Sequence, residues 1–481
     1  MASFLNTFWD KARKLFGSTD ELNPEVSYVS VKANIHEERD GKHLFVWSEA
    51  PFWCVGDSEF CELLKAFEEG QSLQGLLEVH EHWQSKKDEI SSNMRLLRAH
   101  GILQQKGLGD TKKHDEFAIE SISINLTKRC NLRCTFCYNS SGLVKDGSEL
   151  TAHEMIEFLR LTAPHFGEHP SLVILGGEPF LETEKLLQLT EEGNKLGCSV
   201  LVSTNGQLIS QELAVKIAAL SLEVQVSIDG PKSEHHDGAR GKGTFDKACE
   251  AVRTLVDAGV HTIISMVCHK GNVDSLAEYF ELAKKLKAAE ARFIPLRRIG
   301  GGKSSDCQSI PMDELMDAAF DLFTQHPEYL ALAGRDAFSI MANTCKAALA
   351  RPSCGTGLQT LVLDADGQIY PCINLALPQF SLGSIKDGDF DFEELWKARE
   401  NSKLCDIRHS TSLENKDRKC GRCSLRHWCL GGCRGEVWSL TGSLCAPSPD
   451  CERLQKAVIE MFWRITENPE LLPKSSSWAD W

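Results

Sequence analysis

The N-terminal part of the chain alternates between short apolar stretches of strand character and longer amphipathic stretches with helical spacing. This pattern predicts strands at residues 27–35, 43–48 and 52–56, followed by helices at residues 58–70, 72–80 and 86–103. Strands followed by three short helices are typical of a small α+β unit, and we expect a winged-helix-like domain over residues 28–112. Upstream, residues 1–27 carry apolar side chains at roughly helical spacing. They predict an amphipathic segment, docked either on the protein itself or on a membrane surface or partner.

From Ile119 the pattern becomes a regular alternation of strands and helices. Within residues 118–330 we predict strands at 121–127, 171–179, 199–206, 223–230, 261–269 and 291–302, and helices at 151–167, 182–197, 210–221, 244–259, 272–290 and 311–325. Such alternation, with nearly continuous apolar runs in the strands, indicates a parallel sheet built from crossover connections. The fold class is therefore α/β. Each strand ends in a polar or glycine-rich turn, which is where α/β folds place their active sites.

The periodicity breaks down after about Ala342. Residues 343–455 are rich in loops and cysteines, so something other than an apolar core must hold this segment together. Residues 456–481 predict a final helix and a tail.

Composition narrows the possible partners and the compartment. The net charge of −15 argues against a general phosphate-binding surface, so we expect no nucleic-acid partner. No apolar run is long enough to span a bilayer. The chain shows no secretory signal, and we expect a cytoplasmic protein. Nineteen cysteines in a reducing compartment then indicate metal or redox chemistry rather than disulfides.

The first cysteine group follows the first strand of the predicted parallel sheet. Cys130, Cys134 and Cys137 form a C-x3-C-x2-C pattern. Three thiolates on one loop can hold three irons of a four-iron cluster and leave the fourth iron open to an outside ligand. A structural zinc site would need a fourth protein ligand, and none lies close in the sequence. A chance match remains a further alternative, because cysteine is common in this chain.

With Phe136 before the third cysteine, this motif resembles the signature of the radical S-adenosylmethionine (SAM) superfamily. The resemblance implies a partial (β/α)6 TIM-like barrel, and a 4Fe–4S cluster held by the catalytic cysteines Cys130, Cys134 and Cys137. It also implies that the open iron takes the amino and carboxylate groups of S-adenosylmethionine, which is cleaved to a 5′-deoxyadenosyl radical that abstracts a hydrogen from the substrate.

Later turns match the same family in order. GGEP ends the second strand, STNG the third and SIDG the fourth, and an arginine follows. The resemblance assigns these turns to the cofactor, with the glutamate toward the methionyl amino group and the last serine and the arginine toward its carboxylate. The cofactor-binding residues that it implies are Gly176, Gly177, Glu178, Pro179, Ser203, Asn205, Ser227, Asp229 and Arg240.

The C-terminal cysteines follow the spacings C-x12-G-x4-C and C-x2-C-x5-C-x3-C. By themselves these spacings slightly favour zinc. Behind a radical domain they resemble the SPASM extension, which carries two auxiliary 4Fe–4S clusters and brings the total to three. The implied ligands are Cys354, Cys372 and Cys433 for auxiliary cluster I, and Cys420, Cys423, Cys429 and Cys451 for auxiliary cluster II. Some family members supply a fourth ligand to cluster I where this chain has Thr360, so either Cys345 replaces it or that iron is open.

The resemblance implies a maturase that installs a thioether or carbon–carbon crosslink in a ribosomally made peptide or protein subunit. The N-terminal domain would grip this substrate along a strand edge, and flavodoxin or ferredoxin would supply electrons. Two alternatives remain open. One is oxidation of Cys or Ser to formylglycine, as in anaerobic sulfatase maturases, although Ile373 stands where those enzymes carry an aspartate. The other is a zinc-stapled, non-catalytic binding protein.

Overall fold

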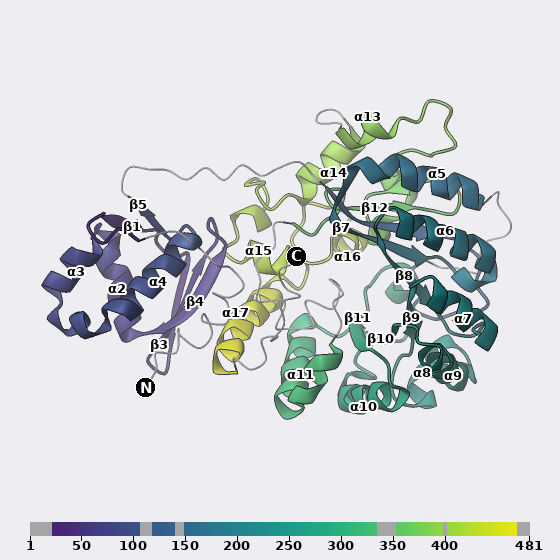
Figure 1. The fold of residues 1–481 in the computed structure, drawn as a ribbon, viewed down its shortest axis with the longest axis horizontal. Helices are drawn as coiled ribbons and strands as arrows, with labels where there is room; N and C mark the ends of the chain where they lie inside the picture. The colour runs from purple at the N-terminus through teal and green to yellow at the C-terminus, as the bar shows by residue number, and fades with distance from the viewer. Residues whose placement is uncertain (1–21, 106–117, 140–148, 334–352, 398–401, 469–481) are drawn as a thin grey trace.

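The computed structural model describes residues 22–105, 118–139, 149–333, 353–397 and 402–468. Most of the predicted N-terminal amphipathic segment, the predicted tail and Cys345 lie outside these ranges. Figure 1 shows the N-terminal unit at one end of the molecule and the large sheet at the other, with the cysteine-rich C-terminal segment between them.

The N-terminal unit contains a three-stranded antiparallel sheet in the order β2-β3-β4, and a separate pairing of β1 with β5. Its elements are β1 (Tyr28–Ser30), β2 (Ile35–Arg39), β3 (Lys42–Trp47), β4 (Phe52–Asp57), α2 (Ser58–Glu68), α3 (Leu73–Val79), α4 (Lys87–Ala99) and β5 (Leu103–Gln105). Strands precede three helices, as predicted, while the winged-helix assignment itself stays a prediction. The sequence did not predict β2, whose residues IHEER are mostly charged.

The large sheet has the order β11-β10-β9-β8-β7-β6-β12-β13, and its pairings from β6 to β11 are all parallel. These strands are β6 (Ile119–Asn125), β7 (Phe166–Leu175), β8 (Ser199–Thr204), β9 (Glu223–Ser227), β10 (Thr262–Cys268) and β11 (Glu290–Pro295). The helices between and after them are α5 (Ala152–Thr162), α6 (Thr183–Lys195), α7 (Gln211–Ala219), α8 (Ser233–Arg240), α9 (Thr244–Asp257), α10 (Leu276–Leu286) and α11 (Met312–Gln325). The predicted α/β alternation is confirmed, and α8 is an addition that the sequence did not predict.

The C-terminal segment continues this sheet. β12 (Thr360–Leu363) pairs in parallel with β6, and β13 (Ile369–Tyr370) returns beside it as a hairpin. Short helices follow: α13 (Phe392–Lys397), α14 (Lys403–Thr411), α15 (Arg426–Cys429) and α16 (Arg434–Thr441). The cysteine-rich segment is therefore anchored on the first strand of the barrel, directly beside the loop that carries the first cysteine group.

The last described helix, α17 (Cys451–Glu467), joins three parts of the molecule. It packs against α11 of the barrel, α15 of the cysteine-rich segment and β4 of the N-terminal unit. Its Phe462 ring stacks on Trp53 of β4 with ring centroids 4.4 Å apart. Within the described ranges, no helix combines the length and apolar character needed to cross a bilayer.

Candidate functional site

The first cysteine group lies on the loop that leaves β6. Cys130, Cys134 and Cys137 are all partly exposed, so the loop is open on one side. Burial raises the pKa of Cys130 and of Cys134, and the neighbouring Cys137 adds to both shifts, which places the three thiols close to one another. The Leu132 amide donates to the Cys130 sulfur over 3.4 Å. Amide donors of this kind stabilise a thiolate that binds metal.

Glycines fix this loop against neighbouring turns. A Cβ on Gly177 would lie 1.9 Å from the carbonyl oxygen of Arg129, and one on Gly176, whose φ is +142°, would lie 2.6 Å from the Thr127 carbonyl. The glycines of GGEP thus permit close approach of two backbones. On the other side, the Gly301 amide donates to the Cys137 carbonyl over 2.9 Å. The cysteine loop is held between the end of β7 and the turn after β11.

Glu178 joins two of the predicted turns. Its carboxylate is 1% exposed and accepts from the Thr204 hydroxyl at 2.7 Å, the Asn205 amide at 2.9 Å and the Phe180 amide at 3.1 Å. Burial raises the pKa of Glu178 and the three donors oppose that rise. The Asn205 side chain in turn donates to Asn131 on the cysteine loop over 2.7 Å. GGEP, STNG and the cysteine loop therefore meet at one point.

Asp229 and Arg240 form a buried ion pair at the fourth turn. The Asp229 carboxylate also accepts from the Val267 amide over 2.9 Å. Arg240, at the end of α8, lies over the ring of Phe136 and places a guanidinium nitrogen 4.0 Å from the Cys134 sulfur. The carboxylate that Arg240 contacts here is the one of Asp229. A further contact with the cofactor carboxylate stays a prediction.

The remaining predicted cofactor residues lie around the same edge of the sheet. Ser203 stands near the end of β8 and accepts from the Gln225 amide over 3.3 Å. Ser227 is the last residue of β9, and Pro179 begins the short turn after GGE. Apart from Arg240 at the end of α8, the residues that the family resemblance assigned to S-adenosylmethionine thus lie at or just beyond a carboxyl end of the parallel strands.

The structure also brings Cys354, Cys372 and Cys433 together. Burial raises the pKa of Cys372 to about 12, with further contributions from Cys433 and Cys354. The Asn374 amide group donates to the Cys433 sulfur over 3.4 Å. Thr360 is the first residue of β12, and its hydroxyl lies within hydrogen-bond distance of two backbone carbonyls. Its side chain therefore stabilises the local backbone.

Cys420, Cys423, Cys429 and Cys451 line one small cavity. Burial raises the pKa of Cys429 to about 12 and also raises the pKa of Cys451. Backbone and side-chain N–H groups already point at these sulfurs, with Gly431 donating to Cys429 over 3.2 Å. The four predicted ligands of auxiliary cluster II therefore converge from three separate stretches of chain.

All three groups offer thiols as their metal ligands. Thiolates are the ligands that hold iron–sulfur clusters, so the donor sets fit such clusters.

Two buried arginines lie between the C-terminal cysteine groups. Arg418 and Arg434 are 4% and 2% exposed, and within the described residues Nε and Nη2 of Arg418 and Nη2 of Arg434 have no hydrogen-bond partner. Burial and the neighbouring Arg434 lower the pKa of Arg418, while Cys420 and Cys354 act in the opposite direction. Buried cations without counter-charge are costly. Anionic clusters on either side would supply that charge.

Sequence reasoning could not give the partners of the charged residues that connect these groups. Lys128 beside the cysteine loop pairs with Asp364 at 3.1 Å and Asp366 at 2.5 Å in the β12–β13 turn. Arg298 in the turn after β11 pairs with Glu436 of α16 at 3.1 Å and with Asp450 at 2.7 Å. In the sequence these residues appear only as charged residues near a cysteine or glycine motif. Charged residues in such places are equally often solvated side chains without a structural role.

Comparisons with known proteins agree with this geometry. A model of the radical SAM superfamily matches residues 124–283, and a model of the SPASM iron–sulfur cluster-binding domain matches residues 354–424. Mycofactocin maturase MftC of Mycolicibacterium smegmatis is 30% identical over 335 residues, which cover 68% of this chain and 81% of that protein. AdoMet-dependent heme synthase of Methanosarcina barkeri is 28% identical over 347 residues, which cover 69% and 95%.

Two solved structures share the fold. Native anSMEcpe with bound AdoMet superposes with a TM-score of 0.57 at 22% identity, over 73% of this chain and 99% of that one. Streptococcus suis SuiB bound to S-adenosylmethionine gives a TM-score of 0.53 at 17% identity, over 88% and 100%. The predicted partial barrel followed by a SPASM domain is confirmed.

Proposed function

The chain belongs to the radical SAM superfamily and carries a SPASM domain, and we propose that it modifies a ribosomally made peptide or protein subunit by installing a thioether or carbon–carbon crosslink. One observation carries the proposal. Three turns at the carboxyl ends of successive parallel strands meet a loop with three thiols, and the cysteine-rich segment is anchored on the neighbouring strand.

We assign three 4Fe–4S clusters to the chain. Cys130, Cys134 and Cys137 hold the first, and the fourth iron stays open for S-adenosylmethionine. Auxiliary cluster I takes Cys354, Cys372 and Cys433, with Cys345 as its fourth ligand or an open iron. Auxiliary cluster II takes Cys420, Cys423, Cys429 and Cys451. When bound, the first cluster and S-adenosylmethionine supply one-electron cleavage of a sulfonium and thereby hydrogen abstraction.

The protein residues orient the cofactor and keep water away from it. We assign Glu178 to the methionyl ammonium, with its three present donors fixing the carboxylate at the edge of the sheet where the cofactor would bind. Arg240, fixed by Asp229, holds positive charge beside the Cys134 thiolate. Phe136 and Leu296 belong to a small buried apolar cluster next to the cysteine loop, which limits solvent there.

A large cleft beside the N-terminal unit supports the proposal that the substrate is a peptide. Its volume is about 950 Å³, and its walls come from β2, α11, α17 and the Cys423 loop. Ile35, Glu37 and Arg39 of β2 line it, and β2 is an edge strand of its sheet. An extended peptide can add to such an edge through main-chain hydrogen bonds. The SuiB fold has also been solved bound to its precursor peptide SuiA.

Anaerobic turnover tests the proposal. Reconstituted protein, S-adenosylmethionine, a reductant and a candidate peptide should yield 5′-deoxyadenosine together with a peptide that has lost two hydrogen atoms. Replacement of sulfur by oxygen together with the loss of two hydrogen atoms in a cysteine-containing peptide would instead establish formylglycine formation. Cleavage of the cofactor without any change in a peptide partner would count against the proposal.

The similarity to a heme synthase favours a second candidate, chemistry on a tetrapyrrole. The two candidates differ in what the N-terminal unit does. Deleting residues 1–112 should abolish turnover of a peptide and leave turnover of a small tetrapyrrole largely intact.

A further inference from the structure

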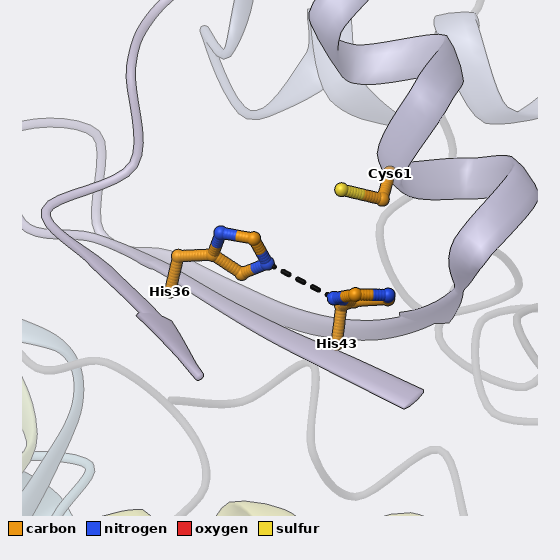
Figure 2. A group of neighbouring side chains, drawn as sticks. All are labelled: His36, His43 and Cys61. Atoms are coloured by element: carbon orange, nitrogen blue, oxygen red, sulfur yellow. Dashed lines mark hydrogen bonds between the residues drawn. The ribbon is translucent and has the colours of Figure 1, made fainter. Parts of the chain in front are cut away.

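A second group of metal-ligating side chains lies in the N-terminal unit, away from the cysteine groups described above. His36 on β2, His43 on β3 and Cys61 on α2 each place one ligand atom within 4.8 Å of the other two. Figure 2 shows the three side chains converging from the strands and the helix. Among the described residues, no other set of three His, Cys, Asp or Glu ligand atoms has this spacing.

The fold of the unit creates this convergence. His36 and His43 occupy diagonal positions on one face of the β2–β3 ladder. Opposite His43, β4 carries Gly56, where a Cβ would lie 2.4 Å from the Phe60 side chain of α2. The missing side chain lets α2 pack close to the sheet. Cys61, the residue after Phe60, is thereby carried to the two imidazole rings.

The distances are near those of a metal site. His36 Nε2 lies 3.1 Å from His43 Nδ1. A tetrahedral zinc ion with bonds of about 2.0 Å to nitrogen and 2.3 Å to sulfur requires about 3.3 Å between two nitrogens and about 3.6 Å between nitrogen and sulfur. Small side-chain shifts would therefore bring all three atoms onto one ion.

The surroundings also suit a metal. Cys61 is 5% exposed and His43 9%, whereas His36 is exposed, so a fourth coordination position faces solvent. His43 Nε2, the nitrogen turned away from the group, lies 3.4 Å from the Ser58 hydroxyl. An outer hydrogen bond of this kind fixes the orientation of a metal-binding imidazole.

We propose that His36, His43 and Cys61 form a binding site for a divalent ion of the zinc class, with three protein ligands and a fourth position open to solvent. Two imidazoles and one thiolate are the ligand set that such borderline ions prefer. Binding displaces the proton of the Cys61 thiol to solvent and transfers no electron. The alternative is a metal-free hydrogen bond between the two rings, in which Cys61 has no part.

A metal ion at this position would hold β2 against β3 and α2. β2 is an edge strand with one strand partner, and its His36 face points toward α2. The alternate residues Ile35, Glu37 and Arg39 line the 950 Å³ cleft. An ion on one face of β2 therefore orders the strand whose other face borders the cleft.

Zinc loading of the full-length protein, with its iron–sulfur clusters reconstituted first, tests the proposal. After anaerobic incubation with zinc chloride and gel filtration, mass spectrometry for metals should find one zinc per chain. X-ray absorption at the zinc edge, which iron does not obscure, should show nitrogen and sulfur ligands together. Zinc with four sulfur ligands, or no retained zinc, would overturn the proposal.

Variants locate the ion. His36→Ala and Cys61→Ala should each weaken zinc binding by more than about a hundredfold, because even groups that only orient metal ligands are worth about 10–100-fold. Ser58→Ala should weaken it about tenfold. Cys54→Ala is the matched control, since it removes a buried thiol from the neighbouring strand outside the group. Zinc affinity unchanged in both His36→Ala and Cys61→Ala would contradict the assignment.

Hydrogen exchange tests the effect on β2. Zinc should slow amide exchange across residues 35–39 in the unmodified chain and leave it unchanged in His36→Ala. His36→Ala also removes a ring that stacks on Phe45, so exchange is compared with and without zinc within the same variant. Equal exchange with and without bound zinc would show that the ion does not order the strand.

Discussion

The barrel and the C-terminal segment both gather cysteines, but they do so in different ways. In the barrel, three thiols lie on one loop whose position is set by a parallel sheet and by glycine contacts. In the C-terminal segment, seven thiols come from residues spread between 354 and 451, and the described residues between them form short helices and two short strands. We expect the first site to keep its fold without metal and the second to depend on its metal, because a site assembled from distant segments gains folding free energy from the bound metal.

The two regions differ less in the burial of their thiols, since five of the seven C-terminal thiols are partly exposed like the first three. The first three thiols are partly exposed, which suits a site that must admit S-adenosylmethionine and a substrate. Cys420 and Cys429 are buried, and Arg418 and Arg434 are enclosed between the C-terminal groups.

Removing the thiols of the first cysteine group should abolish activity and leave folding nearly unchanged. This is the largest expected effect. In the triple variant Cys130→Ala, Cys134→Ala, Cys137→Ala, production of 5′-deoxyadenosine should fall to the enzyme-free background, a loss of at least about 10⁶-fold. The thermal transition should stay close to that of the control Cys198→Ala, which removes a buried barrel thiol. Persistent cofactor cleavage in the triple variant would refute the assignment of the first cluster.

Chelation of iron should affect the two regions unequally. Under anaerobic conditions, iron removal should speed amide exchange in α15 and α16 by about 100-fold or more, since the metal supplies part of their folding free energy. Exchange in β7 and β8 should change little. Equal loss of protection in both regions would mean that the barrel also depends on its metal.

Lowering the pH should reduce the free energy of unfolding of the barrel, because the unfolded chain takes up a proton at His236 more readily than the folded chain. Burial lowers the pKa of His236 to about 4, and its Nδ1 accepts from the Asp229 amide over 3.1 Å. Because the unfolded chain binds this proton near pH 6.5 and the folded chain only near pH 4, stability is full above pH 6.5 and falls as pH decreases toward 4. The expected loss is about 3 kcal/mol, and denaturant unfolding from pH 7 to pH 4 measures it.

The variant His236→Asn keeps a hydrogen-bond acceptor and has no titrating ring. Its stability should depend less on pH over the same interval. An unchanged pH slope would assign the acid sensitivity to another group.

The smallest expected effect concerns the enclosed arginines. Arg434→Met should make reduction of the auxiliary clusters harder, because a neighbouring positive charge stabilises the more negative reduced state. A shift of about 60 mV corresponds to a tenfold change for a one-electron couple. A redox titration monitored by electron paramagnetic resonance should show this shift in the reduction potential of the auxiliary clusters. The reduction potential of the first cluster should stay unchanged.

The two regions also differed in how far the sequence could predict them. The six barrel strands combine continuous apolar runs with polar turns, and each pairs with a strand nearby in the sequence, so their order could be predicted. The pairing of β12 with β6 could not, because it joins segments more than two hundred residues apart. β2 was missed because an edge strand tolerates charge, and its sequence IHEER has the composition of a loop.

The candidate site shows the same limit. Cysteine spacings identified three thiol groups, which the structure then brought together wherever their residues are described. The hydrogen bonds of Glu178 and the position of Arg434 had no such signal, because a glutamate or an arginine in a turn is usually solvated. His36, His43 and Cys61 follow no familiar spacing, and only the packing of α2 on the sheet brings them together.

Helix α17 has a mechanical consequence. At about 1.5 Å per residue, its 17 residues form a rod of about 25 Å, with Cys451 at one end and the Phe462 ring, on which Trp53 rests, near the other. Cys451, the predicted ligand of auxiliary cluster II, and Phe462, which packs on the N-terminal sheet, therefore lie on one continuous helix.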